Sequence, residues 1–579
     1  MKIKRLDISN YRSLDGLSFS FHSEVNFIVG LNNIGKSNLL KLLNTLVNKR
    51  NFIEEDFNDI EKSIEIEITL FLDEDEIGVF EDLFDPTNER QINIIALQEN
   101  PDENITFIHA ETETVISSSL IKKLNFIYYD SLRKPSNELN FNTKTGSGRF
   151  LSHLIDLYTK NDEKVQPEDL INNTYLAGLL DYINSKLELI ETFEANDIKA
   201  DTGNEIKEIL SRLIILKNDE NFPVDKLGYG IQFSNLVPIS ILERIFNIKR
   251  RKKTFENAII TDGNGTVTLP ITLGLDEPEI HLHPHLQRKL IKYIYRITTN
   301  SQRDFNNLLS DLFGINSIKG QLFVVTHSPN ILLDDYKHIV RIYKNSNGEV
   351  LVSSGVDIEL DDDLEKHLNK HMQYIKEAFF SRKVIFVEGD SELLAIKVFA
   401  ERMEIDLDDY EVSVISAGSA DSIPPLVDLF NKFGIETVSI IDGDKKEGDK
   451  FKNIKNLYIT QGQDFEEDIY MYFNFSDYIR YLEEQYTDDP KKYLFFMGQA
   501  KKLGIDINPR QRPVYKELEK IDNGQNLDRL KEELKSDVLN SLRGNKSILQ
   551  GRLLSEAVTE IPQTYRDAIK KAMELSIYE

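Results

Sequence analysis

Residues 26–40 read Asn-Phe-Ile-Val-Gly-Leu-Asn-Asn-Ile-Gly-Lys-Ser-Asn-Leu-Leu, and this stretch decides how the first part of the chain is interpreted. Its apolar start predicts a β-strand, and the leucines at 39, 40, 42 and 43 have helical spacing. Between them lies the pattern Gly-x-x-x-x-Gly-Lys-Ser. A strand, a glycine-rich loop and a helix in this order form a phosphate-binding P-loop. The flanking strand and helix argue against a chance glycine turn.

The residue types of this loop suit the chemistry of a nucleotide. Gly30 and Gly35 let the backbone direct N–H groups inward, and the helix N-terminus adds positive potential. Lys36 would reach the outer phosphates, and the Ser37 hydroxyl would be a ligand of the Mg²⁺ that accompanies ATP. The predicted ATP contacts of the loop are Asn32, Asn33, Gly35, Lys36, Ser37 and Asn38.

Composition narrows the classes of protein. A chain of 579 residues is long enough for two or more domains. It contains no Cys, so a metal ion would need carboxylate, imidazole or hydroxyl ligands. A net charge of −27 argues against a surface that coats nucleic acid, although residues 249–253 and the cations at 510, 512, 516 and 520 form local basic runs. We see no signal peptide or spanning run and expect a cytoplasmic protein without a membrane partner.

Alternating patterns and a helical block describe the middle of the chain. Residues 63–72 and 91–95 alternate apolar and polar side chains, which predicts an antiparallel β layer. Residues 123–130 predict another strand. The pattern from 148 to 216 is helical, and we interpret it as an insertion that serves dimerisation. A homodimer or higher homo-oligomer is therefore expected.

Three further motifs follow the P-loop. A glycine-rich segment, Gly228-Tyr229-Gly230-Ile231-Gln232, precedes an apolar helix. A buried strand then ends in Asp276-Glu277, where the Asp can hold Mg²⁺ and the Glu can polarise the water that attacks the γ-phosphate. A third strand ends at His327, which we interpret as a γ-phosphate contact rather than a loop residue.

In this order the four motifs resemble those of ABC-type ATPases of the RecF and SMC kind. The resemblance implies that nucleotide is held between two heads, the signature of one facing the P-loop of the other. It makes Gly228, Gly230 and Gln232 the signature loop, Glu277 the catalytic base and His327 the switch histidine. Two features depart from the pattern, because the signature is not Ser-Gly-Gly and no coiled-coil arm is present.

A second unit with its own set of acidic motifs begins near residue 373. The strand 383–387 ends in Glu388-Gly389, and the strand 437–441 ends in Asp442-Gly443-Asp444. If these strands deliver their acids to one sheet edge, the oxygens would form a Mg²⁺ site able to support phosphodiester cleavage. Either motif alone more often marks the solvent-exposed end of a strand than a metal site.

Together these motifs resemble a Toprim domain, and an ABC-type head followed by a Toprim domain resembles the OLD (overcoming lysogenisation defect) family of nucleases. The resemblance implies a two-metal site, with Glu388 also acting as acid or base and Asp468 as an alternative ligand. It also implies a C-terminal cation, for which Lys546 is the first choice and Arg552 the second. The predicted metal ligands are Glu388, Glu392, Asp442, Asp444, Asp464 and Glu466, with Ser37 and Asp276 at the ATP-bound ion.

The sequence therefore predicts an α/β protein with an ATPase head, a helical insertion and a Rossmann-like Toprim domain. The expected segments are 1–147 and 217–372 for the head, 148–216 for the insertion and 373–579 for the Toprim domain with a helical extension. The resemblance implies an ATP-regulated DNA endonuclease using Mg²⁺ or Mn²⁺, in bacterial defence against phage, with a helicase-type or retron partner. The alternative is a nucleotide-dependent DNA-binding sensor with a non-catalytic Toprim domain. A topoisomerase or primase finds no support, since no marked nucleophilic Tyr or zinc ligands accompany the Toprim motifs.

Overall fold

The computed structural model describes two compact units, Met1–Glu359 and Leu360–Glu579, which are considered separately. The division lies at 359/360, whereas the sequence pattern places it at 372/373. The described residues are 1–77, 83, 88–130, 148, 150, 153–154, 173–190, 198–202, 214–250, 255–256, 258–280, 282–360, 368, 372, 375–445, 448–485, 496–498, 501–502, 508, 513–521, 525–544 and 547–574.

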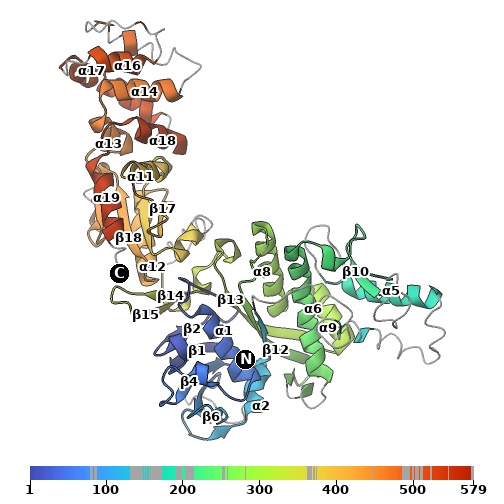
Figure 1. The fold of residues 1–579 in the computed structure, drawn as a ribbon. Helices are drawn as coiled ribbons and strands as arrows, with labels where there is room; N and C mark the ends of the chain where they lie inside the picture. Colours follow the sequence, from blue (N-terminus) through green and yellow to red (C-terminus); the bar gives the residue numbers. More distant parts are fainter. Residues whose placement is uncertain are drawn as a thin grey trace. The chain divides into compact units, whose positions relative to one another are not determined.

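The first unit contains an antiparallel sheet built from alternating sequence (Figure 1). In β4 (Ile64–Phe71) the isoleucines are buried while Glu65 and Glu67 are exposed. This alternation gives the sheet one apolar face, as predicted. In spatial order the strands are β2 (Ser18–Ser20), β1 (Lys2–Ser9), β4, β5 (Gln91–Gln98), β6 (Thr106–His109) and β7 (Val115–Ile116).

The second sheet of this unit is mostly parallel and carries the nucleotide motifs. Because β3, β12 and β13 run parallel, their carboxyl ends meet at one edge of the sheet. That edge receives the P-loop, the Asp276-Glu277 pair and His327. In spatial order the strands are β11 (Ile260–Thr261), β12 (Val267–Asp276), β13 (Ser317–Val325), β3 (Val25–Gly30), β14 (Ile339–Lys344) and β15 (Val350–Ser354), and β8 (Phe126–Tyr129) also pairs with β12.

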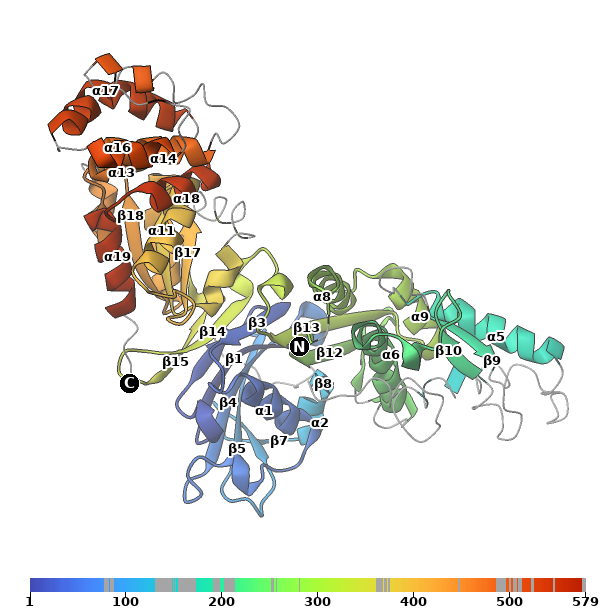
Figure 2. The ribbon, with the colours of Figure 1, turned by 45° about the horizontal axis from the view of Figure 1, so that its top comes forward.

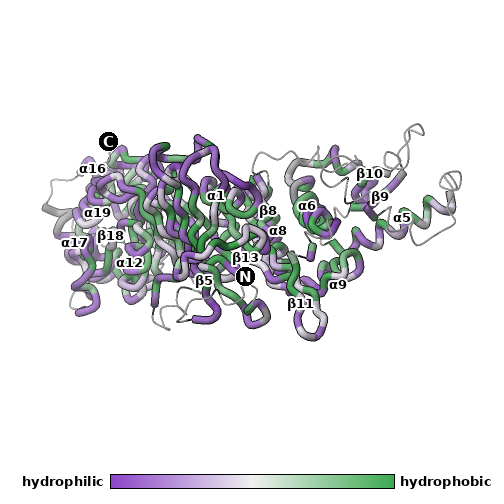
Figure 3. Tube along the Cα trace, turned by 90° about the horizontal axis from the view of Figure 1, so that it is seen from below, coloured by the Kyte–Doolittle hydropathy of each residue, from purple (hydrophilic) through white to green (hydrophobic). Residues whose placement is uncertain are grey.

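Helix α1 (Lys36–Asn48) joins the two sheets. Its leucines at 39, 40, 42 and 43 are buried in one core with side chains of β4 and β13. The remaining long helices of the unit are α6 (Tyr229–Arg250), α8 (Pro284–Thr298) and α9 (Arg303–Phe313). Figure 3 shows hydrophobic stretches along central elements such as α1 and β13. Among the residues that the structure describes, no helix is long and apolar enough to cross a membrane.

The segment predicted to be a helical insertion is mixed where the structure describes it. Helix α5 (Asn173–Leu187) is followed by an antiparallel pair, β9 (Lys199–Thr202) and β10 (Ile214–Lys217) (Figure 2). Ala200 and Leu216 face each other and are buried, while Asp201 and Lys217 form an ion pair 2.6 Å long. The two-residue alternation of buried and charged side chains favours strands, so the helical prediction is wrong for residues 199–202 and 214–217.

The second unit is a parallel sheet with helices on both faces (Figure 1). Ile385 and Val387 share a core with α11 (Asp390–Arg402) and α19 (Gln563–Glu574), whereas Phe386 contacts Phe430 of α12 (Ile423–Lys432). Successive side chains of one strand thus face opposite helix layers. In spatial order the strands are β17 (Val412–Ser416), β16 (Lys383–Val387), β18 (Glu436–Ile441) and β19 (Leu457–Ile459).

A helical extension packs on this sheet unit. Where α11 crosses α18, Gly551 lies against the Ser391 backbone, and a Cβ added at Gly551 would be 1.7 Å from the Ser391 oxygen. Arg402 donates to the carbonyls of Ser555 and Thr559 and so caps the C-terminal end of α18. The helices of the extension are α13 (Phe465–Tyr472), α14 (Phe475–Gln485), α16 (Val514–Ile521), α17 (Gln525–Arg543) and α18 (Ile548–Ala557).

Candidate functional site

The P-loop connects β3 to α1 through two glycines that no other residue could replace without strain. Gly30 has φ +145°, and an added Cβ would lie 2.1 Å from the Ile342 carbonyl oxygen. Gly35 has φ +105°, and its Cβ would lie 2.6 Å from Ser13 Oγ. The loop therefore has the conformation that exposes backbone N–H groups to an anion.

Lys36 lies over this loop. Its Nζ donates to the carbonyls of Gly30, at 2.9 Å, and Leu31, at 2.6 Å. The side chain is buried, and this burial lowers the pKa of Lys36 to about 8. Negative charge from a bound phosphate group would raise the pKa of Lys36 and favour its charged form.

Ser37 and Asp276 place two oxygens together at the sheet edge. Ser37 Oγ donates to Asp276 Oδ1 at 2.9 Å, and Tyr128 donates its hydroxyl to Asp276 Oδ2 at 3.2 Å. Burial raises the pKa of Asp276. This oxygen pair fits the Mg²⁺ of a bound nucleotide. The sequence did not single out Tyr128, although its place at the end of a neighbouring strand was a usable signal.

Glu277 and His327 also meet at this edge. Glu277 has φ +50°, and its Oε1 lies 3.6 Å from His327 Nε2. Burial, and then the charge of Lys36, lower the pKa of His327. The two predicted γ-phosphate residues are therefore neighbours.

Glu279, which the sequence interpretation missed, fixes the histidine loop. Its Oε1 accepts hydrogen bonds from Thr326 Oγ1 at 2.9 Å and from the His327 backbone N–H at 2.6 Å. Burial raises the pKa of Glu279. The third acid of Asp-Glu-Pro-Glu was the available signal, but only tertiary contacts give it a partner.

The other predicted ATP residues lie around the P-loop and at the start of α6. Asn32 and Asn33 are exposed, and Asn38 accepts a 3.2 Å hydrogen bond from Arg12, another residue that the sequence reading missed. Gly228 and Gly230 lie at the N-terminus of α6. The Gln232 amide donates to the carbonyls of Asp225 and Leu227, so it holds the loop that precedes the helix.

The Toprim acids begin at the tips of β16 and β18. These neighbouring parallel strands place Glu388 and Asp442 side by side, and the Asp442 backbone N–H donates to Glu388 Oε2 at 3.3 Å. Glu392, one turn into α11, accepts from the Gly389 N–H at 2.6 Å. Burial, then the charges of Asp442 and Glu388, raise the pKa of Glu392 well above its usual range. A cation at this edge would relieve that repulsion.

Of the remaining predicted acids, Glu466 acts on the charge of Glu392, whereas Asp444, Asp464 and Asp468 interact with other residues. Glu466 is completely buried and raises the pKa of Glu392 further. Asp444 is exposed and pairs with Lys445 at 2.8 Å. Asp464 caps α13 and pairs with Arg543 through two hydrogen bonds of 2.8 and 3.1 Å. Asp468 accepts from the backbone of residues 461 and 462.

The donor set fits a hard divalent cation, since it contains only oxygen atoms. Its side chains are not arranged as a closed cage: within the described residues no group of three or more His, Asp or Glu side chains is placed to hold a metal ion. Of the two predicted cations, Lys546 lies outside the described residues. Arg552 is exposed and pairs with Glu556 of its own helix at 2.7 Å.

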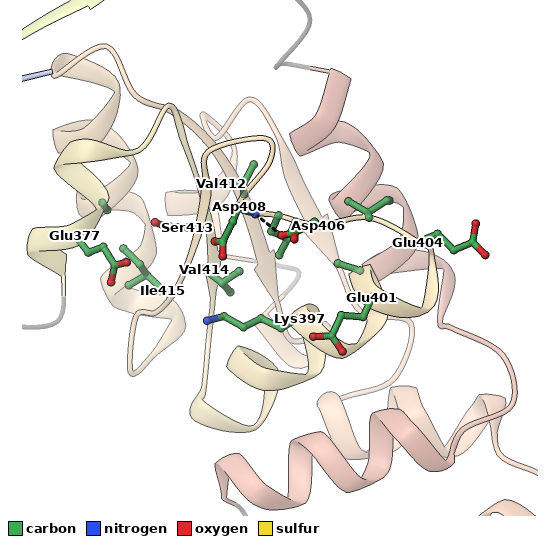
Figure 4. Close-up of a pocket in the computed structure, with 14 residues that line it drawn as sticks. Glu377, Lys397, Glu401, Glu404, Asp406, Asp408, Val412, Ser413, Val414 and Ile415 are labelled. Atoms are coloured by element: carbon green, nitrogen blue, oxygen red, sulfur yellow. Dashed lines mark hydrogen bonds between the residues drawn. The ribbon is translucent and has the colours of Figure 1, made fainter. Parts of the chain in front are cut away.

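A cavity of about 530 Å³ in the same unit is separate from these acids (Figure 4). It is lined by Lys397 and Glu401 of α11, by Asp406 and Asp408 and by the edge strand β17. None of the predicted metal ligands lines it. The acid cluster at the tips of β16 and β18 remains the candidate reactive site of this unit.

Comparisons with known proteins match a domain family in each of the two units. The AAA ATPase domain family matches residues 1–145 and 98–332. The family described as overcoming lysogenization defect protein-like, TOPRIM domain, matches residues 379–444. These matches confirm the predicted pairing of an ATPase with an OLD-like Toprim domain.

Two relatives and one solved structure show the extent of the similarity. Endonuclease GajA of Bacillus cereus is 23% identical over 396 residues, which cover 64% of this chain and 50% of that protein. OLD nuclease of Thermus scotoductus is 22% identical over 484 residues, covering 76% of this chain and 82% of that protein. An Smc head bound to the C-winged helix domain of ScpA is 13% identical, covering 63% of this chain and 99% of that one, with a TM-score of 0.36.

The chain thus spans half the length of the GajA relative. The ATPase match extends over residues 1–332 of 579, which is more than half of the sequence. The chain therefore belongs to the AAA ATPase domain family and carries an OLD-like Toprim domain after its ATPase.

Proposed function

We propose that this protein is an ATP-regulated, divalent-metal-dependent DNA endonuclease of the OLD family. The observation that carries the proposal is the meeting of Glu388 and Asp442 at adjacent strand tips, with buried Glu392 behind them. Acids collected at one sheet edge, where burial and then like charges raise the pKa of Glu392, are suited to a metal-assisted reaction with a phosphodiester. The names of the relatives, an endonuclease and a nuclease, support the same reaction class.

The residues take separate roles in this proposal. Bound Mg²⁺ or Mn²⁺ would supply an activated water and charge neutralisation at the scissile phosphate. Glu388, Glu392, Asp442 and Glu466 would hold the ions, and Glu388 would also accept or return a proton. Asp444 and Asp464 would join them only after leaving Lys445 and Arg543. Lys546, or Arg552 in second place, would steady the phosphate.

In the ATPase unit, Lys36, Ser37 and Asp276 would hold ATP and its Mg²⁺ ion. Glu277 would orient the attacking water next to His327. Gly228, Gly230 and Gln232 would face the P-loop of a second copy, so hydrolysis would require a homodimer or a larger homo-oligomer. Residues 148–216 would contribute to that contact. We further propose a cytoplasmic role in anti-phage defence, with a helicase-type or retron partner.

The alternative is a nucleotide-dependent DNA sensor with a non-catalytic Toprim domain. The ion pairs of Asp444 with Lys445 and of Asp464 with Arg543 favour it, because paired acids are weaker metal ligands. The clustering of Glu388 and Glu392 with Asp442 at the strand tips favours the nuclease.

Plasmid cleavage separates the two functions. The wild-type protein, incubated with supercoiled plasmid and Mg²⁺ or Mn²⁺, should nick or linearise it. Asp442→Ala should reduce the cleavage rate at least a hundredfold and leave ATP affinity unchanged. Asp428→Ala is the matched control, since Asp428 is an exposed acid of α12 paired with Lys432. Cleavage by a metal-clean Asp442→Ala preparation at the wild-type rate would assign the reaction to another site.

A further inference from the structure

A basic groove in the ATPase unit is lined by residues of α1, β8 and the second half of α6. Figure 2 labels these three elements. Its volume is about 730 Å³. Lys122, Arg244 and Arg250 line it, together with the amide side chains of Asn44, Asn48 and Asn247. We use the name basic groove for this cavity, of whose lining these six residues are the cations and three of the asparagines.

The charge of the groove contrasts with that of the chain. The protein carries a net charge of −27, yet three cations and a single acid, Asp130, line this cavity. Arg244 is 3.9 Å from Glu243, a loose ion pair. In the described part of the chain, Lys122 and Arg250 have no carboxylate within 4.0 Å, and both side chains are exposed. Their charges are therefore available to a ligand.

Only part of the basic run at 249–253 belongs to the groove. Lys249 donates to the Phe313 carbonyl and lies over the rings of Phe255 and Phe313, so it points elsewhere. Arg250 lines the groove, and residues 251–254 lie outside the described residues. Of the described residues in the run 249–253, Arg250 therefore lines the groove and Lys249 does not. The other two cations of the groove, Lys122 and Arg244, lie outside that run.

Both helices of the groove begin at nucleotide motifs. Helix α1 starts at Lys36 of the P-loop, and α6 starts at the Gly228 signature segment. Tyr128, also in the groove wall, donates its hydroxyl to Asp276. A ligand in the groove would therefore contact the far ends of two helices that begin at nucleotide motifs, and the strand β8 that carries Tyr128.

We propose that the basic groove binds the phosphate backbone of DNA and that this binding changes the rate of ATP hydrolysis. The cations are exposed, two of them six residues apart on α6 and the third at Lys122, which suits successive phosphates of a polymer better than one enclosed small ligand. The neighbouring asparagine amides can donate to phosphate or sugar oxygens. DNA as the ligand class rests on the proposed function, but the groove is distinct from the Toprim acids.

The test compares two charge-reversed variants of the full chain. Arg244→Glu with Arg250→Glu alters the groove. Lys292→Glu with Arg303→Glu is the matched control, because these exposed cations of α8 and α9 do not line it. Affinity for a fluorescent DNA duplex is measured from about 50 to about 200 mM salt, a range over which counterion release changes the affinity strongly. ATP hydrolysis is measured with and without that DNA.

The groove variant should bind DNA at least tenfold more weakly than the control, and its log–log salt slope should be smaller by about two. Its ATPase rate without DNA should equal that of the wild type, while the response to DNA should be lost. Equal DNA affinity and equal salt slopes for the two variants would overturn the groove assignment and leave the nuclease proposal standing. DNA binding with this pattern but no wild-type cleavage would defeat the nuclease proposal and leave the groove standing. A wild-type chain that does not bind DNA would overturn the groove inference as well.

Discussion

At the scale of single residues, Lys36 shows how burial can tune a nucleotide contact. Its pKa is lowered to about 8 because the buried ammonium loses hydration. Above that pH the side chain is mostly neutral and attracts phosphate less strongly. Below it the full positive charge is present.

We therefore expect ATP affinity to fall by up to about tenfold between pH 7 and pH 9, since one pH unit above the pKa leaves about one tenth of the lysines charged. Fluorescent-nucleotide titration at several pH values measures this. Lys36→Arg, whose guanidinium stays charged, should show a flatter profile. A wild-type affinity that is constant across this range would mean that Lys36 without ATP stays charged up to pH 9, and would contradict the lowered pKa.

Gly35 is the residue-scale determinant of the loop conformation. Gly35→Ala should destabilise the ATPase unit by about 2–4 kcal/mol, because positive φ strain adds to the contact with Ser13 and Leu14. Gly16→Ala is the control, since Gly16 has φ +74° but no atom within 4 Å of an added Cβ. Urea unfolding should show a larger loss for Gly35→Ala; equal losses would attribute the effect to φ alone.

At the scale of elements, the crossing of α11 and α18 holds the acid cluster in place. Glu392 lies on α11, one residue beyond Ser391, whose carbonyl touches Gly551 of α18. The absence of a side chain at position 551 lets the two helices approach closely.

Gly551→Ala should separate these helices and lower the stability of the Toprim unit by several kcal/mol, about 3 or more by analogy with overpacked cores. Gly498→Ala is the matched control, because a Cβ there meets no atom within 4 Å. Thermal unfolding followed by circular dichroism compares them. Equal melting temperatures for the two variants would show that the crossing tolerates a methyl group.

The loop after β13 depends on Glu279 in a similar way. Glu279→Ala removes the acceptor of two hydrogen bonds at Thr326 and His327, so the loop should lose its position. We expect kcat for ATP hydrolysis to fall about ten- to a hundredfold, with a much smaller change in ATP affinity. Glu279→Gln retains an acceptor oxygen and should recover part of the rate. Equal kcat values for the wild type and Glu279→Ala would remove the positioning role.

At the scale of the whole molecule, the two compact units separate the two chemistries. Lys36→Ala should abolish ATP hydrolysis while the fold of the Toprim unit is retained, because Lys36 belongs to the other compact unit and its Nζ donates to carbonyls of its own loop. Plasmid cleavage by this variant with and without ATP then measures regulation directly. If ATP still changes the cleavage rate of Lys36→Ala as it does that of the wild type, nucleotide binding at the P-loop does not regulate DNA cleavage.

Much of the fold followed from local pattern. The alternation in residues 64–71 predicted the antiparallel sheet, and Gly-x-x-x-x-Gly-Lys-Ser between an apolar strand and a leucine-rich helix predicted the P-loop. The hairpin of β9 and β10 was missed, because short strands embedded in a helical pattern are recognised only through their pairing. Helix and strand periodicity are local properties, so they are visible in sequence.

The acids and cations that are available can be read from the sequence, since Glu388, Glu392, Asp442 and the P-loop residues stand in recognisable motifs. Which of these residues contact one another depends on the three-dimensional fold. It joined Glu388 to Asp442, paired Asp464 with Arg543, and gave Glu279 and Tyr128 their partners. The physical reason is that a motif fixes the spacing of residues along the chain, whereas contacts between strand tips and helices depend on packing among residues far apart in sequence.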